Sequence, residues 1–197
     1  SHQCCEDFGL MRTIPGMTVM CPADDVEATA MVRAAYEHVG PVYMRFARLA
    51  TPVFHDPDHY TFQIGKGEVL RDGTDVAIIA TGLMVYEALE AAKALEADGI
   101  SARVINMATI KPLDEELVLS AAKKCGKVLT VEEHNIIGGL GSAVTEVVCE
   151  TVPVPVVRVG VNDVFGKSGP AAELLKVFGL CAENIVAKTK EALALKK

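Results

Sequence analysis

A short apolar run, a glycine-rich turn and a helical pattern follow one another between Val128 and Cys149. Residues 128–131 are apolar or β-branched, which predicts a buried strand, and residues 142–149 carry apolar side chains at helical spacing. Between them stand Gly138, Gly139 and Gly141, which let the backbone adopt φ > 0 and let a helix start close to the sheet. A strand, a turn and a helix in this order form the repeating unit of open α/β sheets.

Turns of this kind lie at the carboxyl edge of such a sheet, where ligands and partner surfaces collect. The stretch contains neither the dinucleotide fingerprint G-x-G-x-x-G nor a phosphate loop ending in Gly-Lys-Ser/Thr. We therefore predict a tight turn packed against a neighbouring chain rather than a nucleotide cradle.

The same order of elements repeats through residues 66–197 and predicts a complete three-layer α/β domain. Half of the residues are hydrophobic, with few aromatics, which suits parallel strands covered by helices. Residues 67–74, with a turn at Asp72-Gly73, predict a short strand and a hairpin into the next strand. We expect a mostly parallel five-stranded sheet with one antiparallel edge strand. The further strands are expected at 75–81, 100–107, 127–131 and 154–159, and the helices at 84–98, 113–125, 142–150, 171–178 and 183–195.

Residues 1–48 predict only part of a doubly wound domain. A helix at 6–14, a strand at 17–21, a helix capped by Asp24 and a strand at 41–48 follow in order. Two strands are too few for a stable sheet covered on both faces, so we expect their partner strands on missing residues or on another subunit. The chain lacks an initiator Met and looks processed, tagged or cut from something longer. Residues 49–65, with two prolines and no periodicity, predict an extended linker.

Composition and charge exclude several classes of function. The net charge of −7, with no basic cluster, argues against nucleic acid as a partner. No apolar run has membrane-spanning length and no signal peptide is present, so we expect neither a membrane partner nor secretion. Six cysteines without a C-x-x-C pair favour free thiols in a reducing cytoplasm over disulfides or a metal site.

Two short stretches resemble ligand sites but favour simpler interpretations. His55 and His59, with Asp56 and Asp58, could suggest a metal, but without a regular element beneath them a solvated surface loop is favoured. Residues 165–170 contain a Gly-Lys-Ser, yet Val161 stands where a phosphate loop has its upstream glycine. A loop that starts a helix, with Ser168 near the cap, is favoured there.

Three groups of polar residues could carry chemistry. His2 could be an acid–base or anion-binding group, and a frayed terminal His is the alternative. Arg45 and Arg48 could each bind a phosphate or carboxylate. Residues three apart on a strand point to opposite faces, so only one of the two arginines can face a given site. A surface ion pair for each is favoured. Glu132, Glu133 and His134 follow a strand and could do acid–base work; capping the next turn or pairing with another subunit is favoured.

The order and spacing of these stretches resemble the transketolase family over essentially the whole chain. Ser1-His2-Gln3, residues 10–19, Pro22-Ala-Asp24 and Gly40-Pro-Val42 are similar to the end of its pyrimidine-binding domain. Residues 75–82, 111–113, 131–141 and 165–175 are similar to its C-terminal domain. The resemblance implies a pyrimidine-binding fragment at 1–48, a linker at 49–65 and a transketolase C-terminal domain at 66–197.

The same resemblance implies a thiamine-diphosphate enzyme that moves a two-carbon ketol unit between phosphorylated sugars, with the cofactor supplying the carbanion chemistry. By match, His2 would contact the donor hydroxyls or the cofactor-bound intermediate, and Arg48 would bind the sugar phosphate. The family's cofactor-activating Glu and its Mg²⁺ motif have no counterpart in this sequence. We therefore expect no cofactor or metal ligand in this chain alone, an N-terminal transketolase portion as its partner, and a homo-oligomer formed through 66–197.

Other functions stay open at this point. Deoxyxylulose-phosphate synthase shares the architecture, although Ser1-His2-Gln3 favours transketolase. The β chain of a 2-oxoacid dehydrogenase is a further relative and would need a lipoyl-domain partner. In a different class, the chain would be a catalytically silent module that self-associates.

Overall fold

The computed structural model describes residues 4–195, so His2 lies outside the described part of the chain. A five-stranded sheet, in the order β3-β5-β4-β7-β8, forms its centre. The middle strand β4 (Val76–Ala80) is fully buried and runs parallel to β5 (Ala102–Asn106) and β7 (Val128–Asn135). Strand β8 (Val156–Val161) runs parallel to β7, and β3 (Glu68–Arg71) lies antiparallel at the other edge. The predicted mostly parallel sheet with one antiparallel edge strand is confirmed.

The predicted hairpin is wrong, because β3 pairs with β5 and not with the next strand along the chain. The reason lies at Gly73, where a Cβ would stand 2.4 Å from the carbonyl carbon of Ala102. The turn crosses the start of β5 at this point, and the N–H groups of Thr74 and Asp75 both donate to the Ser101 carbonyl. The chain thus passes over β5 before it enters the sheet at the central position of β4.

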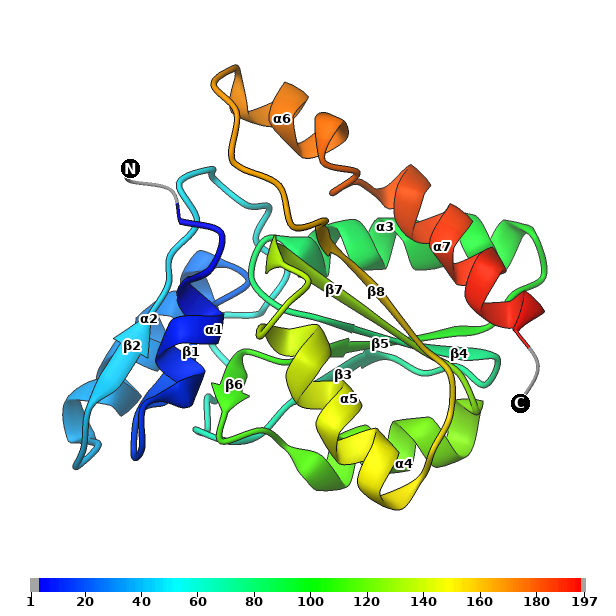
Figure 1. Cartoon of the computed structure of the whole chain (residues 1–197). Coiled ribbons are helices and arrows are strands. Elements are labelled where there is room, and N and C mark those ends of the chain that lie inside the picture. The colour runs from blue at the N-terminus through cyan, green and yellow to red at the C-terminus, as the bar shows by residue number, and fades with distance from the viewer. Residues whose placement is uncertain (1–3, 196–197) are drawn as a thin grey trace.

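Two pairs of helices cover the two faces of this sheet (Figure 1). Helices α3 (Met84–Ala97) and α7 (Ala182–Ala194) pack on one face, where Ile78 and Leu129 point. Helices α4 (Glu115–Cys125) and α5 (Leu140–Thr151) pack on the other, together with Ile79 and Val128. Alternate residues of each central strand therefore enter opposite cores, which explains the uninterrupted apolar runs in the sequence. None of the helices between residues 4 and 195 is long and apolar enough to cross a membrane.

The N-terminal part holds α1 (Asp7–Thr13), β1 (Thr18–Met20), α2 (Asp25–Glu37) and β2 (Val42–Met44), with β1 parallel to β2. Asp24 accepts a hydrogen bond from the Glu27 N–H at 2.9 Å, so it caps α2 as predicted. A third strand, β6 (Thr109–Lys111), pairs antiparallel with β1. The expectation that all further strands lie outside this chain is therefore wrong for this edge of β1. Three residues in front of a proline are too short a run for periodicity to reveal a strand.

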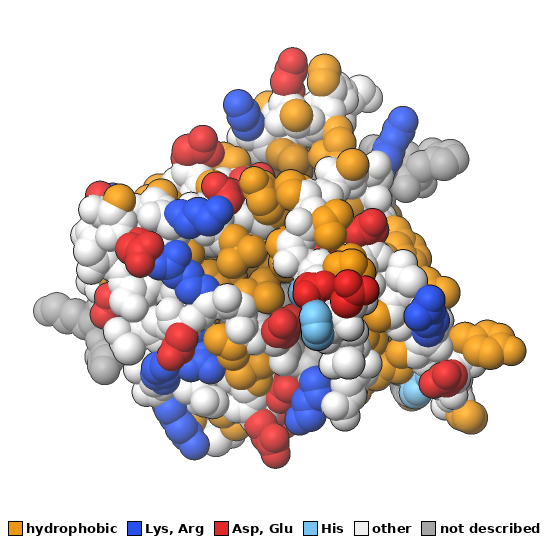
Figure 2. All heavy atoms as spheres, turned by 180° about the vertical axis from the view of Figure 1, so that it is seen from behind, with side chains coloured by type: hydrophobic (Ala, Val, Ile, Leu, Met, Phe, Trp, Pro, Cys, Tyr) orange, Lys and Arg blue, Asp and Glu red, His pale blue; other side chains and the backbone are white. Residues whose placement is uncertain are grey.

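Helix α6 (Ala171–Val177) and the loop before it project from the body of the molecule (Figure 1). The loop at 165–170 leads into α6 as predicted, with Ser168 two residues before the N-cap position; Pro170 occupies that position and no side chain caps the helix. The helix has no buried residue, and Val164, Phe165 and Val177 are exposed. Figure 2 shows hydrophobic side chains on this projection, interspersed with acidic and basic ones.

Candidate functional site

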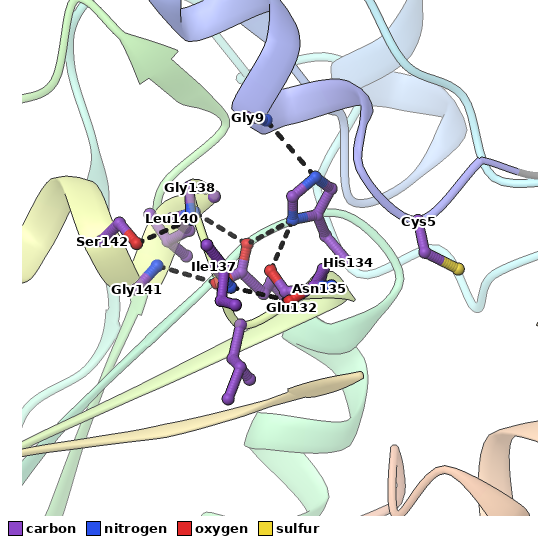
Figure 3. Close-up of polar contacts among 12 residues, drawn as sticks. Cys5, Gly9, Glu132, His134, Asn135, Ile137, Gly138, Leu140, Gly141 and Ser142 are labelled. Carbon is purple, nitrogen blue, oxygen red and sulfur yellow. Dashed lines mark hydrogen bonds and ion pairs between the residues drawn. The ribbon is translucent and has the colours of Figure 1, made fainter. Parts of the chain in front are cut away.

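The last residues of β7 meet the segment that leads into α1, and this junction is the candidate site. The Asn135 N–H donates to the Cys5 carbonyl at 2.6 Å, so the two stretches run against each other. Glu132, Glu133 and His134 are consecutive residues of β7, and each contacts a different part of the chain. Figure 3 shows Glu132 and His134 beside the turn that begins α5.

Glu132 caps α5 from inside the protein. Its carboxylate accepts hydrogen bonds from the N–H groups of Leu140 at 2.7 Å and Gly141 at 2.8 Å (Figure 3). The side chain is fully buried, and desolvation raises the pKa of Glu132 to about 7 although both N–H groups favour the charged form. Of the alternatives that the sequence leaves open, capping of the following turn is the one the structure has. The positive end of α5 is thus filled by a carboxylate of the same chain.

The glycine turn packs against α1 of the same chain. The Arg12 guanidinium donates from Nη1 to the Gly138 carbonyl at 2.6 Å. A Cβ on Gly9 would stand 3.5 Å from the Gly138 Cα, so helix and turn lie backbone to backbone. Gly138 has a φ of 82°, which favours glycine. The predicted tight turn is confirmed, and its predicted contact with a neighbouring chain stays a prediction.

His134 is fully buried and holds α1 against β7. Its Nε2 accepts from the Gly9 N–H at 3.4 Å, and its Nδ1 lies 2.6 Å from the Asn135 carbonyl oxygen (Figure 3). These two partners require a neutral ring with its hydrogen on Nδ1. Burial lowers the pKa of His134, which also favours the neutral ring. The Phe8 ring stacks on the imidazole, with 4.9 Å between the ring centroids. The arrangement makes His134 a packing and hydrogen-bonding group without access to a substrate.

Arg45 and Glu133 form the charged part of the junction. The Arg45 Nε lies 3.2 Å from Asp7 Oδ2, and its Nη1 donates to Glu133 Oε2 at 3.3 Å. Tyr43 donates its hydroxyl hydrogen to Asp7 Oδ2 at 2.9 Å. Burial, and in second place the Asp7 carboxylate, raises the pKa of Tyr43 to about 12. The side chain of Arg45 is 17% exposed, so the expected surface ion pair is in fact a largely buried network.

Arg48 stands apart from this network. Strand β2 ends at Met44, so neither arginine lies on a regular strand, and the expected alternation of faces does not apply. Arg45 turns inward to Asp7, whereas Arg48 is exposed to solvent. The structure thus leaves the Arg48 guanidinium accessible to an anion, which is what a phosphate contact requires.

A second polar cluster, which the sequence analysis missed, fixes the linker. His55 is buried, with Nδ1 2.9 Å from Asp24 Oδ2 and Nε2 3.1 Å from Glu68 Oε2. The two carboxylates outweigh desolvation and raise the pKa of His55 to about 9, so the ring is charged. The expectation of a solvated surface loop is therefore wrong for His55, while His59 is exposed. The partners of His55 lie 31 and 13 residues away in the sequence, so no local pattern could have predicted this cluster.

Among residues 4–195 no three His, Cys, Asp or Glu side chains are arranged to hold a metal ion. The acidic groups of the junction are already occupied by Arg45, by the Tyr43 hydroxyl and by backbone N–H groups. The described residues of this chain therefore do not by themselves fit a Mg²⁺ diphosphate group.

The family models agree with this architecture. Residues 65–185 match the transketolase C-terminal domain, and residues 1–53 match the transketolase pyrimidine-binding domain. The chain belongs to the transketolase family. The recognised family is thereby confirmed, including the order of its two domains. This family depends on thiamine diphosphate.

Individual relatives in the transketolase family support the same conclusion. A protein of Methanocaldococcus jannaschii named as a transketolase C-terminal section is 47% identical over 98% of this chain and 61% of its own length. A 6-deoxy-6-sulfo-D-fructose transketolase subunit of a Clostridium species is 47% identical over 97% of this chain and 59% of its length. A 1-deoxy-D-xylulose-5-phosphate synthase of Heliobacterium modesticaldum is 40% identical over 97% of this chain and 30% of its length.

A solved structure described as a split-gene transketolase, inactive beta4 tetramer, is 52% identical and superimposes with a TM-score of 0.95. It is matched over 100% of this chain and 64% of its own length. The chain thus spans roughly three-fifths of the first transketolase relatives it matches.

Proposed function

We propose that this chain is one component of a transketolase that transfers a two-carbon ketol unit between phosphorylated sugars. The observation that carries the proposal is the contact of Arg45 with the Cys4 carbonyl, at 3.4 Å from Nη2. Through this contact the segment that follows His2 runs beside the segment that leads to Arg48. Two stretches that resemble substrate-binding segments of the family are thereby neighbours.

In this proposal Arg48 binds the sugar phosphate and His2 contacts the donor hydroxyls. An exposed guanidinium can form two parallel hydrogen bonds to phosphate oxygens, and Arg48 is exposed. Thiamine diphosphate, which supplies the carbanion chemistry in this family, and Mg²⁺ are held by a complementary N-terminal portion. The assembly works in the cytoplasm on small phosphorylated sugars, without nucleic acid or membrane as a partner.

The decisive experiment mixes this chain with the N-terminal portion, thiamine diphosphate and Mg²⁺ and follows ketol transfer from a phosphorylated ketose. We expect transfer in the mixture and none with either component alone. A stable complex that transfers no ketol unit would contradict the proposal.

A synthase activity is the second candidate, because one relative of 40% identity is a 1-deoxy-D-xylulose-5-phosphate synthase. Pyruvate as the donor separates the two reactions, since a synthase releases CO₂ and forms a deoxy sugar phosphate. Absence of CO₂ release from the active mixture would exclude the synthase.

Without its partner, we propose, the chain is a catalytically silent module that self-associates through residues 66–197. This rests on the solved neighbour, which is described as an inactive beta4 tetramer. Sedimentation of the isolated chain is expected to show an oligomer, and a monomer at all concentrations would contradict self-association.

A further inference from the structure

The backbone just after His2 is held from two sides. Cys4 offers its carbonyl to Arg45 Nη2 at 3.4 Å, and Cys5 offers its carbonyl to the Asn135 N–H at 2.6 Å. Arg45 follows β2, and Asn135 ends β7 of the C-terminal domain. Two successive carbonyls are therefore bound by groups from two different parts of the fold.

The Arg45 guanidinium that holds Cys4 is itself held by three further side chains. Glu133 binds Nη1 at 3.3 Å, Asp7 binds Nε at 3.2 Å, and the Phe8 ring lies 5.1 Å below the guanidinium carbon. Asp7 and Phe8 belong to α1, so they move with the segment that is being held. Glu133 is the contact that ties Arg45 to the five-stranded sheet.

We propose that Glu133 is a positioning residue for the substrate contacts made by this chain. Through Arg45 it fixes the Cys4 carbonyl, two residues after His2, and it fixes the start of the segment that leads to Arg48. The C-terminal domain thereby sets the geometry of substrate binding rather than serving only for association. This inference rests on the proposed transketolase function, because His2 and Arg48 have their roles from it.

The test compares wild-type, Glu133→Gln and Glu146→Gln chains, each assembled with the N-terminal portion, thiamine diphosphate and Mg²⁺. Glu146 is the matched control, because it pairs with Arg12 at 2.7 Å across α1 and α5 but contacts neither Arg45 nor Cys4. A displacement of about 1 Å at a reacting group costs up to ~100-fold in rate. We expect Glu133→Gln to lower kcat about 10-fold, with the KM for the cofactor unchanged, and Glu146→Gln to stay within about twofold.

Two readouts separate positioning from mere stability. Amide hydrogen exchange in a peptide covering residues 4–9 should be faster in Glu133→Gln and unchanged in Glu146→Gln. The double variant Arg45→Met/Glu133→Gln should lose no more kcat than the larger single loss, because both residues act through one contact. Equal kcat and equal exchange in the Glu133→Gln and Glu146→Gln assemblies would overturn the inference. If the wild-type assembly transfers nothing, the proposed function fails. Unchanged hydrogen exchange in Glu133→Gln would then also show that Glu133 does not hold the Cys4 backbone through Arg45.

Discussion

The carboxylate of Glu132 occupies the space that a side chain at Gly139 would need. A Cβ built on Gly139 would overlap Glu132 Oε2 and would stand 2.6 Å from His134 Nδ1. Because Gly139 has a φ of −83°, its importance comes from this close approach and not from backbone strain. The glycine allows the carboxylate to reach the first N–H groups of α5.

Replacing Gly139 by Ala should therefore destabilise the fold. We expect the free energy of unfolding to fall by about 1–3 kcal/mol from overpacking alone, with a further loss where the Glu132 hydrogen bonds break. Urea unfolding followed by circular dichroism measures this, since the chain has no Trp. Gly166→Ala is the control, because no atom lies within 4 Å of its Cβ position. Equal effects of the two substitutions would show that Gly139 is not in close contact.

The buried Glu132 should make the chain less stable as the pH rises. Its folded-state pKa of about 7 lies above the ordinary value of 4.5, so between these values the folded chain binds more protons than the unfolded chain. The free energy of unfolding therefore falls across this window, by up to about 3 kcal/mol, and levels off above pH 7. Glu132→Gln resembles the protonated carboxyl and should gain stability relative to wild type as the pH rises from 4.5 to 7. A difference that is independent of pH would contradict the raised pKa.

His55 should contribute stability that is lost at high pH. Its folded-state pKa of about 9 lies above the ordinary 6.5, so its contribution is complete below pH 6.5 and disappears as the pH rises through 9. The loss amounts to at most about 3 kcal/mol. Thermal unfolding at pH 6, 8 and 10 should show this loss in wild type and not in His55→Gln. His59→Gln serves as the control because His59 is exposed; a wild-type slope that survives in His55→Gln would refute the assignment.

Arg48→Ala tests the predicted phosphate contact in the complete assembly. We expect the KM for phosphorylated sugars to rise at least about 10-fold, since a charge-assisted bidentate contact is lost. The KM for unphosphorylated sugars should change less, because they lack the anion. Steady-state kinetics with matched sugar pairs decides the point, and equal effects on both members of a pair would remove Arg48 from the site.

His2→Ala tests the proposed contact of His2 with the donor hydroxyls; His2 lies outside the described part of the chain. We expect kcat to fall at least about 100-fold, since a positioned acid–base side chain contributes roughly 10²- to 10⁴-fold to the rate, with assembly and thermal stability unchanged. Single-turnover rates with a phosphorylated ketose measure the effect. A rate equal to that of wild type would return His2 to the interpretation of a frayed terminus.

The sequence by itself determined the elements and their order. Apolar runs placed the central strands, and Asp24 marked the start of α2. These signals are local, because a strand's burial pattern or a helix cap depends on residues within one or two turns.

Only the tertiary structure decided how these elements meet. Arg45 and Glu133 are 88 residues apart, and Asp24 and His55 are 31 apart, so their pairing follows from the packing of whole elements. The same holds for β3 beside β5 and for β6 beside β1. Because burial and partners set the charge and accessibility of a polar side chain, the sequence could name His134, Arg45 and His55 but could not assign their roles.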